Sequence, residues 1–262
     1  MKIGHFSPGK PMMLLLDGPG SKMNKVKIDE IRNLIRKIPL VSSLIRPVYR
    51  WMTAGAHRAP EFTGSSAYWE GRYVGGGNSG AGSYGKFAEF KAEVINAFVA
   101  EKGIQSVVEF GCGDGNQLKL ARYPRYAGFD VSELAIKKCR ETFGSDPTKI
   151  FELVDDYRGQ IADLALSLDV IYHLVEEGVF ENYMRTLFGA AHRFVIIYSS
   201  DIDDNRQQMG AHVRHRNFSS WVQQVRPDFR LVEHIPNRYP YRGDSRDGSF
   251  ADFFIYERMY LR

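Results

Sequence analysis

Residues 107–116 read Val-Val-Glu-Phe-Gly-Cys-Gly-Asp-Gly-Asn, and this stretch decides the fold. Its first four residues are typical of a buried strand, and they run directly into glycines at alternate positions, Gly111, Gly113 and Gly115. An amphipathic segment, 117–123, follows at once. This order predicts a strand, a tight turn and the start of a helix. Because glycine lacks a Cβ atom, the backbone of such a turn can bend sharply and lie against a ligand.

A second predicted strand, 125–130, ends in Asp130, 19 residues after Gly111. A carboxylate at that position can accept hydrogen bonds from both hydroxyls of a ribose. The glycine spacing is G-x-G-x-G, whereas the dinucleotide fingerprint is G-x-G-x-x-G, and Glu109 precedes the first glycine by two residues. A carboxylate there repels a pyrophosphate and attracts an ammonium group. The expected ligand therefore has a ribose and a cationic end, as S-adenosylmethionine does.

Two further segments that contain aspartates follow Asp130 along the chain. Residues 155–156 are aspartates that end a third predicted strand, and 166–174 reads Leu-Ser-Leu-Asp-Val-Ile-Tyr-His-Leu. Together with 109–115 and Asp130, they resemble motifs I to IV of the class I S-adenosylmethionine-dependent methyltransferases, over about residues 68–258. The resemblance implies S-adenosylmethionine as the cofactor. It also implies an α/β, Rossmann-like, doubly wound sheet of seven mostly parallel strands with an antiparallel last strand.

The alternation of strands and helices independently predicts a parallel sheet with helices on both faces. In such sheets, ligands bind beyond the carboxyl ends of the strands. Gly111, Asp130, Asp155 and Asp169 all fall at predicted strand ends. The other expected elements are helices at 87–99, 132–139, 176–190 and 219–225 and strands at 149–154, 162–169, 193–200, 230–235 and 250–256.

The resemblance implies a role for each matching residue. Glu109 and the glycine turn line the methionine half of the cofactor, Asp130 holds the ribose, and Asp155 or Asp156 faces the adenine amine. A Tyr-Trp-x-x-Arg-Tyr segment, 68–73, is expected to cover the cofactor. The glycine- and serine-rich run behind it is either a hinge or an ordinary linker. The expected cofactor contacts are Tyr68, Arg72, Tyr73, Glu109, Gly111, Cys112, Gly113, Gly115, Asn116, Asp130, Val131, Asp155, Asp156 and Asp169.

Methyl transfer from a sulfonium requires the protein to align an acceptor and, for a hydroxyl, to remove its proton. Histidine suits proton removal because its ordinary pKa is about 6.5. His173 follows the fourth strand, and His212 and His215 follow the fifth; each is a candidate base, and each could equally be structural. Asp169 is expected where the fourth strand opens toward the methyl group.

Two arginines beyond the fifth strand, Arg214 and Arg216, fit an anionic acceptor, although a solvated basic face is the alternative. No metal site is predicted, and the two cysteines, Cys112 and Cys139, do not have metal-ligand spacing. A divalent ion that ionises a hydroxyl, as in some O-methyltransferases, would need several carboxylates to converge. The four candidates for such a site are Asp169, Asp201, Asp203 and Asp204.

The expected function is methyl transfer to a hydroxyl of a small-molecule or glycan-type acceptor, such as an anionic sugar. The motif spacing also resembles methyltransferases found with bacterial surface-polysaccharide enzymes. N-methylation of adenine or glutamine is disfavoured, because 169–172 reads Asp-Val-Ile-Tyr and not Asn/Asp-Pro-Pro-Tyr. A nucleic-acid methyltransferase and a non-catalytic S-adenosylmethionine-binding protein are the alternatives. A nicotinamide enzyme is disfavoured by the glycine spacing.

Residues 1–60 differ from the domain predicted at 61–262, because they hold eleven Lys and Arg against three acids. A helical pattern begins near residue 28, and 40–52 mixes apolar, basic and aromatic residues. Such a stretch packs on its own domain or a second subunit, lies on an anionic membrane, or tracks nucleic acid, the least favoured choice. The apolar run 12–16 is too short for a span or signal peptide. We expect a cytoplasmic protein, with the inner face of a membrane as one site for the extension.

Overall fold

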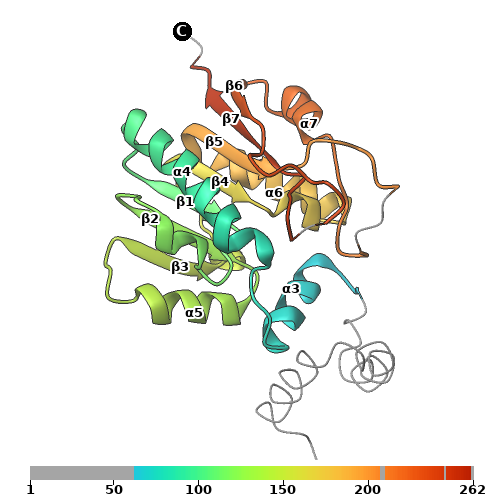
Figure 1. Ribbon diagram of the computed structural model, residues 1–262. Helices are drawn as coiled ribbons and strands as arrows, with labels where there is room; N and C mark the ends of the chain where they lie inside the picture. Colours follow the sequence, from blue (N-terminus) through green and yellow to red (C-terminus); the bar gives the residue numbers. More distant parts are fainter. Residues whose placement is uncertain (1–61, 207–209, 245, 261–262) are drawn as a thin grey trace, which may run out of the picture. The chain divides into compact units, whose positions relative to one another are not determined.

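A computed structural model describes residues 62–206, 210–244 and 246–260 of the chain (Figure 1). The predicted basic extension, 1–60, lies outside the described residues. Its helical pattern and its contacts with a membrane, a partner or its own domain therefore stay predictions. In the described part of the chain, no helix combines the length and the apolar character that a membrane crossing requires.

A seven-stranded sheet forms the centre of the domain, with the strand order β3-β2-β1-β4-β5-β7-β6. Strands β1 to β5 pair in parallel, and β7 runs antiparallel between β5 and β6. The predicted Rossmann-like sheet with an antiparallel last strand is confirmed. The strands are β1 Val107–Phe110, β2 Tyr126–Asp130, β3 Lys149–Leu153, β4 Ala162–Leu168, β5 Ala191–Ser199, β6 Phe229–Ile235 and β7 Asp252–Arg258.

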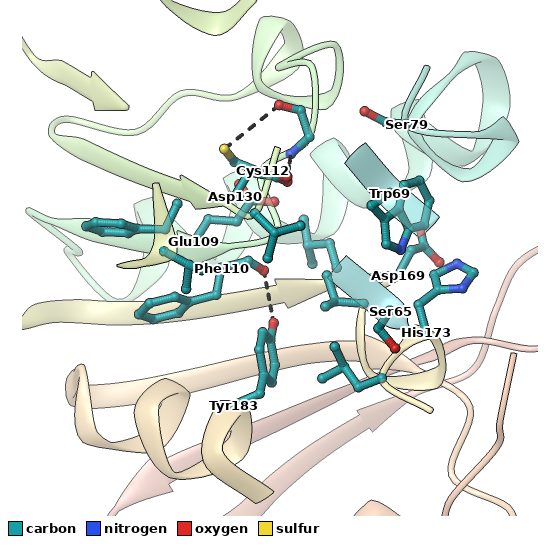
Figure 2. A pocket seen from close by; sticks show the side chains of 18 of the residues that line it. Ser65, Trp69, Ser79, Glu109, Phe110, Cys112, Asp130, Asp169, His173 and Tyr183 are labelled. Carbon is teal, nitrogen blue, oxygen red and sulfur yellow. Dashed lines mark hydrogen bonds between the residues drawn. The ribbon is translucent and has the colours of Figure 1, made fainter. Parts of the chain in front are cut away.

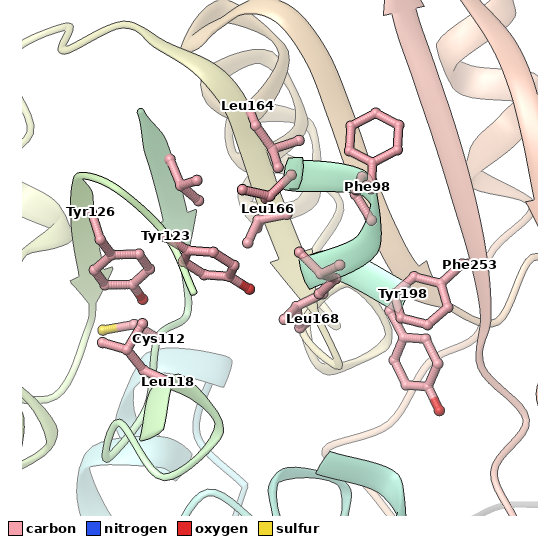
Figure 3. Packing of buried hydrophobic residues seen from close by; sticks show 14 of the residues in the cluster. Phe98, Cys112, Leu118, Tyr123, Tyr126, Leu164, Leu166, Leu168, Tyr198 and Phe253 are labelled. Carbon is pink, nitrogen blue, oxygen red and sulfur yellow. The ribbon is translucent and has the colours of Figure 1, made fainter. Parts of the chain in front are cut away.

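Helices cover both faces of this sheet, and each face has its own apolar core (Figure 1). Phe98 of α4 and Ile136 of α5 belong to the first core, part of which Figure 3 shows around Phe98 and Leu166. Phe180 of α6 and Phe218 of α7 belong to the second. The helices are α3 Ser65–Val74, α4 Gly85–Glu101, α5 Glu133–Phe143, α6 Glu177–Gly189 and α7 Phe218–Val225, with 3-10 turns η1 Ala81–Ser83, η2 Gln117–Leu120, η3 Val154–Asp156 and η4 Ile171–His173.

The register of the sheet places the site. Strands β1, β2 and β4 are parallel neighbours, so their carboxyl ends lie at one edge of the sheet. Gly111 follows β1, Asp130 ends β2 and Asp169 follows β4. The structure therefore brings these three residues to the same edge, as the strand pattern predicts.

The helix predicted after the glycine turn is wrong in length, because the structure has only the single 3-10 turn η2. Asn116, which precedes it, makes no side-chain cap, and the backbone is extended again at Ala121. Pro124 disfavours helical backbone at the residue before it, so a helix cannot continue through this segment. The first turn of chain beyond the glycines is therefore tight and short.

The glycine- and serine-rich run behind α3 is not a free linker. Arg72 Nε donates to the Asn78 carbonyl oxygen at 2.7 Å, and Lys138 Nζ donates to the Gly77 carbonyl oxygen at 3.3 Å. The backbone N–H of Ser79 donates to Asp114 Oδ2 at 3.2 Å. Side chains of three different elements thus hold the run in place; its action as a hinge stays a prediction.

Candidate active site

A pocket of about 360 Å³ lies at the carboxyl edge of β1, β2 and β4 (Figure 2). Its volume falls within the roughly 300–1,000 Å³ that small-molecule pockets occupy. Its wall is made by the glycine turn, the ends of the three strands, and residues of α3, α4 and α6. The residues that the sequence predicts and that line this pocket are Tyr73, Glu109, Gly111, Cys112, Gly113, Asp130, Val131, Asp155, Asp169 and His173.

The glycine turn has left-handed backbone at Gly111 (φ 83°) and Gly113 (φ 58°), a conformation that side chains rarely adopt. A Cβ atom at Gly111 would lie 2.4 Å from Val170 Cγ2, and one at Gly113 would lie 2.3 Å from Ser79 Oγ. Both positions therefore require glycine for space as well as for backbone conformation. The Gly111 and Cys112 N–H groups donate to the Phe129 carbonyl oxygen at 2.7 and 3.1 Å, so the turn is held against β2.

Asp130 is buried at the end of β2 and is fixed by backbone donors. Its Oδ2 accepts from the Gly113 N–H at 2.8 Å, and its Oδ1 accepts from the Ser132 N–H at 3.0 Å. Burial raises the pKa of this carboxyl, and the backbone hydrogen bonds oppose that shift. Each carboxylate oxygen has a further lone pair, so both can still accept from ligand hydroxyls.

Glu109 lies in β1 with only 5% of its surface exposed, and its Oε2 accepts from the Tyr126 hydroxyl at 2.6 Å. Burial raises its pKa to about 7, against the opposing effects of the Tyr126 hydrogen bond and the charge of Lys91. Desolvation penalises a lone carboxylate, and a cation beside it removes the penalty. Glu109 is therefore suited to a cationic ligand group.

A hydrogen-bonded clasp joins the run behind α3 to the glycine turn. Ser79 Oγ lies 2.8 Å from the Tyr73 hydroxyl and accepts from the Asp114 N–H at 2.9 Å. Asp114 Oδ2 accepts from the Tyr84 hydroxyl at 2.8 Å. Because Ser79 and Tyr73 both line the pocket, this clasp sets the width of the pocket beside Gly113.

A buried ion pair lies where β4 ends. Lys91 of α4 is 1% exposed, and its Nζ donates to Asp169 Oδ2 at 2.6 Å. The Tyr172 hydroxyl donates to Asp169 Oδ1 at 2.7 Å. Asp169 has left-handed backbone (φ 61°), and a Cβ atom at Gly82 would lie 2.6 Å from its Oδ2. Both oxygens of Asp169 thus have a hydrogen-bond partner, and the residue lines the pocket with Lys91.

His173 lies near Asp169, and both line the pocket (Figure 2). Its Nδ1–H donates to the His212 carbonyl oxygen at 3.0 Å, and its ring meets that of Trp69 edge-on at 4.9 Å. This bond leaves Nε2 as the unprotonated ring nitrogen. Burial lowers the pKa of His173 to about 4, so the imidazole is neutral at pH 7.

No protein-family model matches the chain, and no curated protein matches it. Among solved structures, it is similar to the N-methyltransferase NodS from Bradyrhizobium japonicum WM9 with S-adenosylhomocysteine, at TM-score 0.52 and 15% identity, covering 66% of this chain and 87% of that chain. It is also similar to magnesium protoporphyrin IX methyltransferase from Synechocystis PCC 6803 with bound S-adenosylhomocysteine, at 0.51 and 16%, covering 64% and 82%. The methyltransferase domain of bacterial Hen1 gives 0.50 and 18%, covering 65% and 97%.

This chain has the class I methyltransferase fold. The identities are low, so the comparison concerns the fold, and the pocket described above lies at the switch point where doubly wound sheets bind ligands.

Within the methyltransferase fold, α3 turns a different face to the pocket than the sequence predicts. Ser65, Trp69 and Tyr73 are four residues apart, so they share one helix face, and all three line the pocket. Tyr68 and Arg72 lie on the adjacent face and do not line it. Trp69 thus lines the pocket where the sequence predicts Tyr68 and Arg72, and the cofactor contacts predicted for those two residues stay predictions.

Three other predicted cofactor residues, Gly115, Asn116 and Asp156, do not line the pocket. Asn116 Nδ2 donates to the Ser83 carbonyl oxygen at 2.8 Å, which fixes η1. A Cβ atom at Gly115 would lie 2.8 Å from Phe143, so this glycine packs against α5. Asp156 pairs with Arg158 at 3.6 Å on the surface, whereas Asp155 lines the pocket.

Of the three candidate bases, only His173 lines the pocket. His212 stacks on Tyr68 at 4.2 Å and supports His173 through its carbonyl oxygen. His215 is buried, and its Nδ1 lies 2.7 Å from Ser200 Oγ. His212 and His215 do not line the pocket, and a contact of either with the acceptor stays a prediction.

Neither arginine expected to contact an anionic acceptor lines the pocket. Arg216 donates to the Leu174 and Val175 carbonyl oxygens at 2.5 and 2.8 Å, and Arg214 pairs with Glu177 at 3.1 Å. Both arginines hold the loop before α6.

Three of the four aspartates that could have converged on a divalent ion accept hydrogen bonds in and beside the loop after β5. Asp201 accepts from the Ser219 N–H, Asp203 from the Asn217 N–H, and Asp204 from Arg206. Within residues 62–206, 210–244 and 246–260, no group of three or more His, Cys, Asp or Glu is placed to hold a metal.

Several residues that line the pocket are not among the site residues predicted from the sequence. Lys91 interrupts the apolar face of the predicted helix at 87–99, and that charge in a core stripe is the signal that could have found it. Ser79 and Gln117 carry no such signal, because their places depend on packing between α3, α4 and the glycine turn. The unpredicted polar and aromatic residues of the wall are Ser65, Ser66, Trp69, Ser79, Ser83, Lys91, Phe110, Gln117, Phe129, Asn182, Tyr183 and Thr186.

Proposed function

We propose that the protein is an S-adenosylmethionine-dependent methyltransferase. The observation that carries the proposal is the pair of buried carboxylates, Glu109 and Asp130, in one pocket with the glycine turn. Asp130 suits two ribose hydroxyls, and Glu109 suits an ammonium. Asp155 lies further along the wall, where it can accept from an adenine amine. The residues present therefore fit the nucleoside and the amino-acid end of this cofactor.

The bound cofactor supplies a sulfonium that makes its methyl group electrophilic. The chain's own residues hold the ligand, exclude water and receive the proton of the acceptor. His173 Nε2 and the Asp169 carboxylate are the candidate acceptors of that proton, and both residues line the pocket. Lys91 and Tyr172 orient the Asp169 carboxylate, so its position does not depend on the ligand.

We propose a hydroxyl of a small-molecule or glycan-type compound as the acceptor, in the setting of surface-polysaccharide synthesis. The neutral aromatic ring of Trp69 and the hydroxyl of Ser66 suit a sugar. An anionic sugar loses support, because Arg214 and Arg216 lie elsewhere. The test is transfer of labelled methyl from S-adenosylmethionine to neutral sugars, uronic acids, sugar nucleotides and amines. We expect label on a neutral hydroxyl; label on amines alone would contradict an O-methyltransferase.

The proposed setting also includes a cytoplasmic location, with the basic extension at the inner face of a membrane or on a second copy of the chain. Its support is the composition of residues 1–60. Sedimentation of the full chain with vesicles containing anionic lipid tests the membrane contact. Equal sedimentation with neutral vesicles would contradict it.

We expect S-adenosylhomocysteine to bind about tenfold more weakly at pH 6 than at pH 8, since a pKa shift is a binding free energy. The pKa of Glu109 is about 7, so below that value the carboxyl is protonated and no longer attracts the ligand ammonium. The affinity therefore rises with pH through 7. Calorimetry at both pH values measures it. Methylthioadenosine, which lacks the amino-acid end, is the control and should show a flat profile; a flat profile for both ligands would contradict the role of Glu109.

We expect His173→Ala to lower turnover by on the order of a hundredfold, the usual contribution of a general base. S-Adenosylhomocysteine affinity should change less than about twofold, because His173 is proposed to contact the acceptor and not the cofactor. The matched control is His215→Ala, since His215 is buried against Ser200 and does not line the pocket. Unchanged turnover in the His173 variant would remove this residue from the mechanism and leave Asp169 as the proton acceptor.

A further inference from the structure

Gln117 begins η2 directly after the glycine turn, and its side chain lines the pocket with 8% of its surface exposed. Its Nε2 donates to the Ala88 carbonyl oxygen of α4 at 3.0 Å. This bond fixes the orientation of the amide, because a carbonyl oxygen accepts only from the nitrogen end. The oxygen Oε1 therefore points away from Ala88.

Oε1 of Gln117 is buried, and none of the described residues donates a hydrogen bond to it. A buried acceptor without a donor is unfavourable and needs an explanation, such as a ligand or a water. Lys91 does not donate to this oxygen. It lies one turn along α4 from Ala88, but its Nζ donates to Asp169. Gln117 thus carries, on the wall of the pocket, an acceptor that no described residue uses.

Glu109 is the second acceptor on this side of the pocket. Glu109 lines the same pocket as Gln117 and Lys91. The Tyr126 hydroxyl uses one lone pair of Glu109 Oε2 and leaves the others. An ammonium has three N–H donors and therefore matches two acceptors better than one.

We propose that Gln117 Oε1 accepts a hydrogen bond from the ammonium at the amino-acid end of the cofactor, beside the Glu109 carboxylate. The inference rests on the proposed function and adds a residue that selects for the amino group. The short η2 turn makes the contact, because it directs the side chain of its first residue under α4 and not along a longer helix.

The test is calorimetric titration of the full chain and of Gln117→Met with three probes: S-adenosylhomocysteine, its analogue with hydrogen in place of the α-amino group, and methylthioadenosine. Methionine keeps the length of the side chain and removes the acceptor. We expect S-adenosylhomocysteine to bind the variant roughly tenfold more weakly, the usual effect of a hydrogen bond to a charged group. The other two probes should bind within about twofold of their original affinity, because they lack the ammonium.

Gln105→Met is the matched control, since the Nε2 of that exposed glutamine also donates to a carbonyl oxygen, that of Gly103, at 3.2 Å. Gln117→Glu restores an acceptor and should restore the preference for the amino group. An equal loss for all three probes in Gln117→Met, or no loss, would overturn the inference. If the original protein binds none of the probes, the proposed function itself fails, and the inference fails with it.

Discussion

Asp169→Asn is expected to lower the free energy of unfolding by roughly 3–5 kcal/mol, the cost of leaving a buried charge without its partner. Lys91 is almost fully buried, and Asp169 is the carboxylate that its ammonium contacts, at 2.6 Å. Lys91→Met should cost less, because the Asp169 side chain keeps 15% exposure and the hydrogen bond from Tyr172. Urea unfolding of the two variants measures the difference.

The double variant Lys91→Met/Asp169→Asn separates this ion pair from simple loss of packing. It removes both charges, so it should be more stable than the sum of the single changes indicates. Glu257→Gln is the surface control: its pair with Arg230 has side chains 42% and 64% exposed and should contribute less than about 1 kcal/mol. Additive single effects, or an Asp169→Asn effect as small as the control, would contradict a buried ion pair.

Gly113→Ala is expected to destabilise the protein by about 1–3 kcal/mol, the usual cost of a non-glycine residue forced into strained backbone. It should also weaken S-adenosylhomocysteine binding at least about tenfold, or roughly 1.4 kcal/mol. The new Cβ would lie 2.3 Å from Ser79 Oγ and 3.1 Å from the Tyr73 hydroxyl, so the clasp must open. The Gly113 N–H would then move from Asp130.

Gly178→Ala is the matched control, because Gly178 lies in α6 and nothing approaches its added Cβ within 4 Å. Alanine is the better helix former by about 1 kcal/mol, so this variant should be as stable as the original or more so. Thermal unfolding and calorimetry compare the two. If Gly113→Ala binds ligand as well as Gly178→Ala does, the glycine turn does not shape the pocket.

The sheet and the centre of the pocket are predictable from the sequence because they depend on short-range order. The strand before Gly111 and the strand that ends in Asp130 fix the places of the turn and of the carboxylate, whatever packs around them. The length of η2 was also open to prediction, since Pro124 limits any helix there. The helix predicted there is wrong in length, because amphipathic periodicity alone does not reflect the effect of this proline.

The walls of the pocket depend on packing between distant segments, and the sequence does not contain that information in a local form. The rotation of α3 decides that Trp69 and not Tyr68 faces the pocket, and the anchor for that rotation is the contact of Ser65 with Glu176, 111 residues away. In the sequence, His173 and His212 are both histidines that follow a predicted strand. Only the folded chain shows that one lines the pocket and the other supports it.

The most direct test of the central claim is calorimetric titration of the full chain with S-adenosylhomocysteine and with NADH, repeated on Asp130→Ala. Asp163→Ala is the control, because Asp163 Oδ2 also accepts backbone N–H groups, those of Gln105 and Ser106, without lining the pocket. We predict binding on the order of micromolar for S-adenosylhomocysteine alone, lost in Asp130→Ala and kept in Asp163→Ala. Binding of NADH in preference, or S-adenosylhomocysteine binding that Asp130→Ala leaves unchanged, would contradict the account.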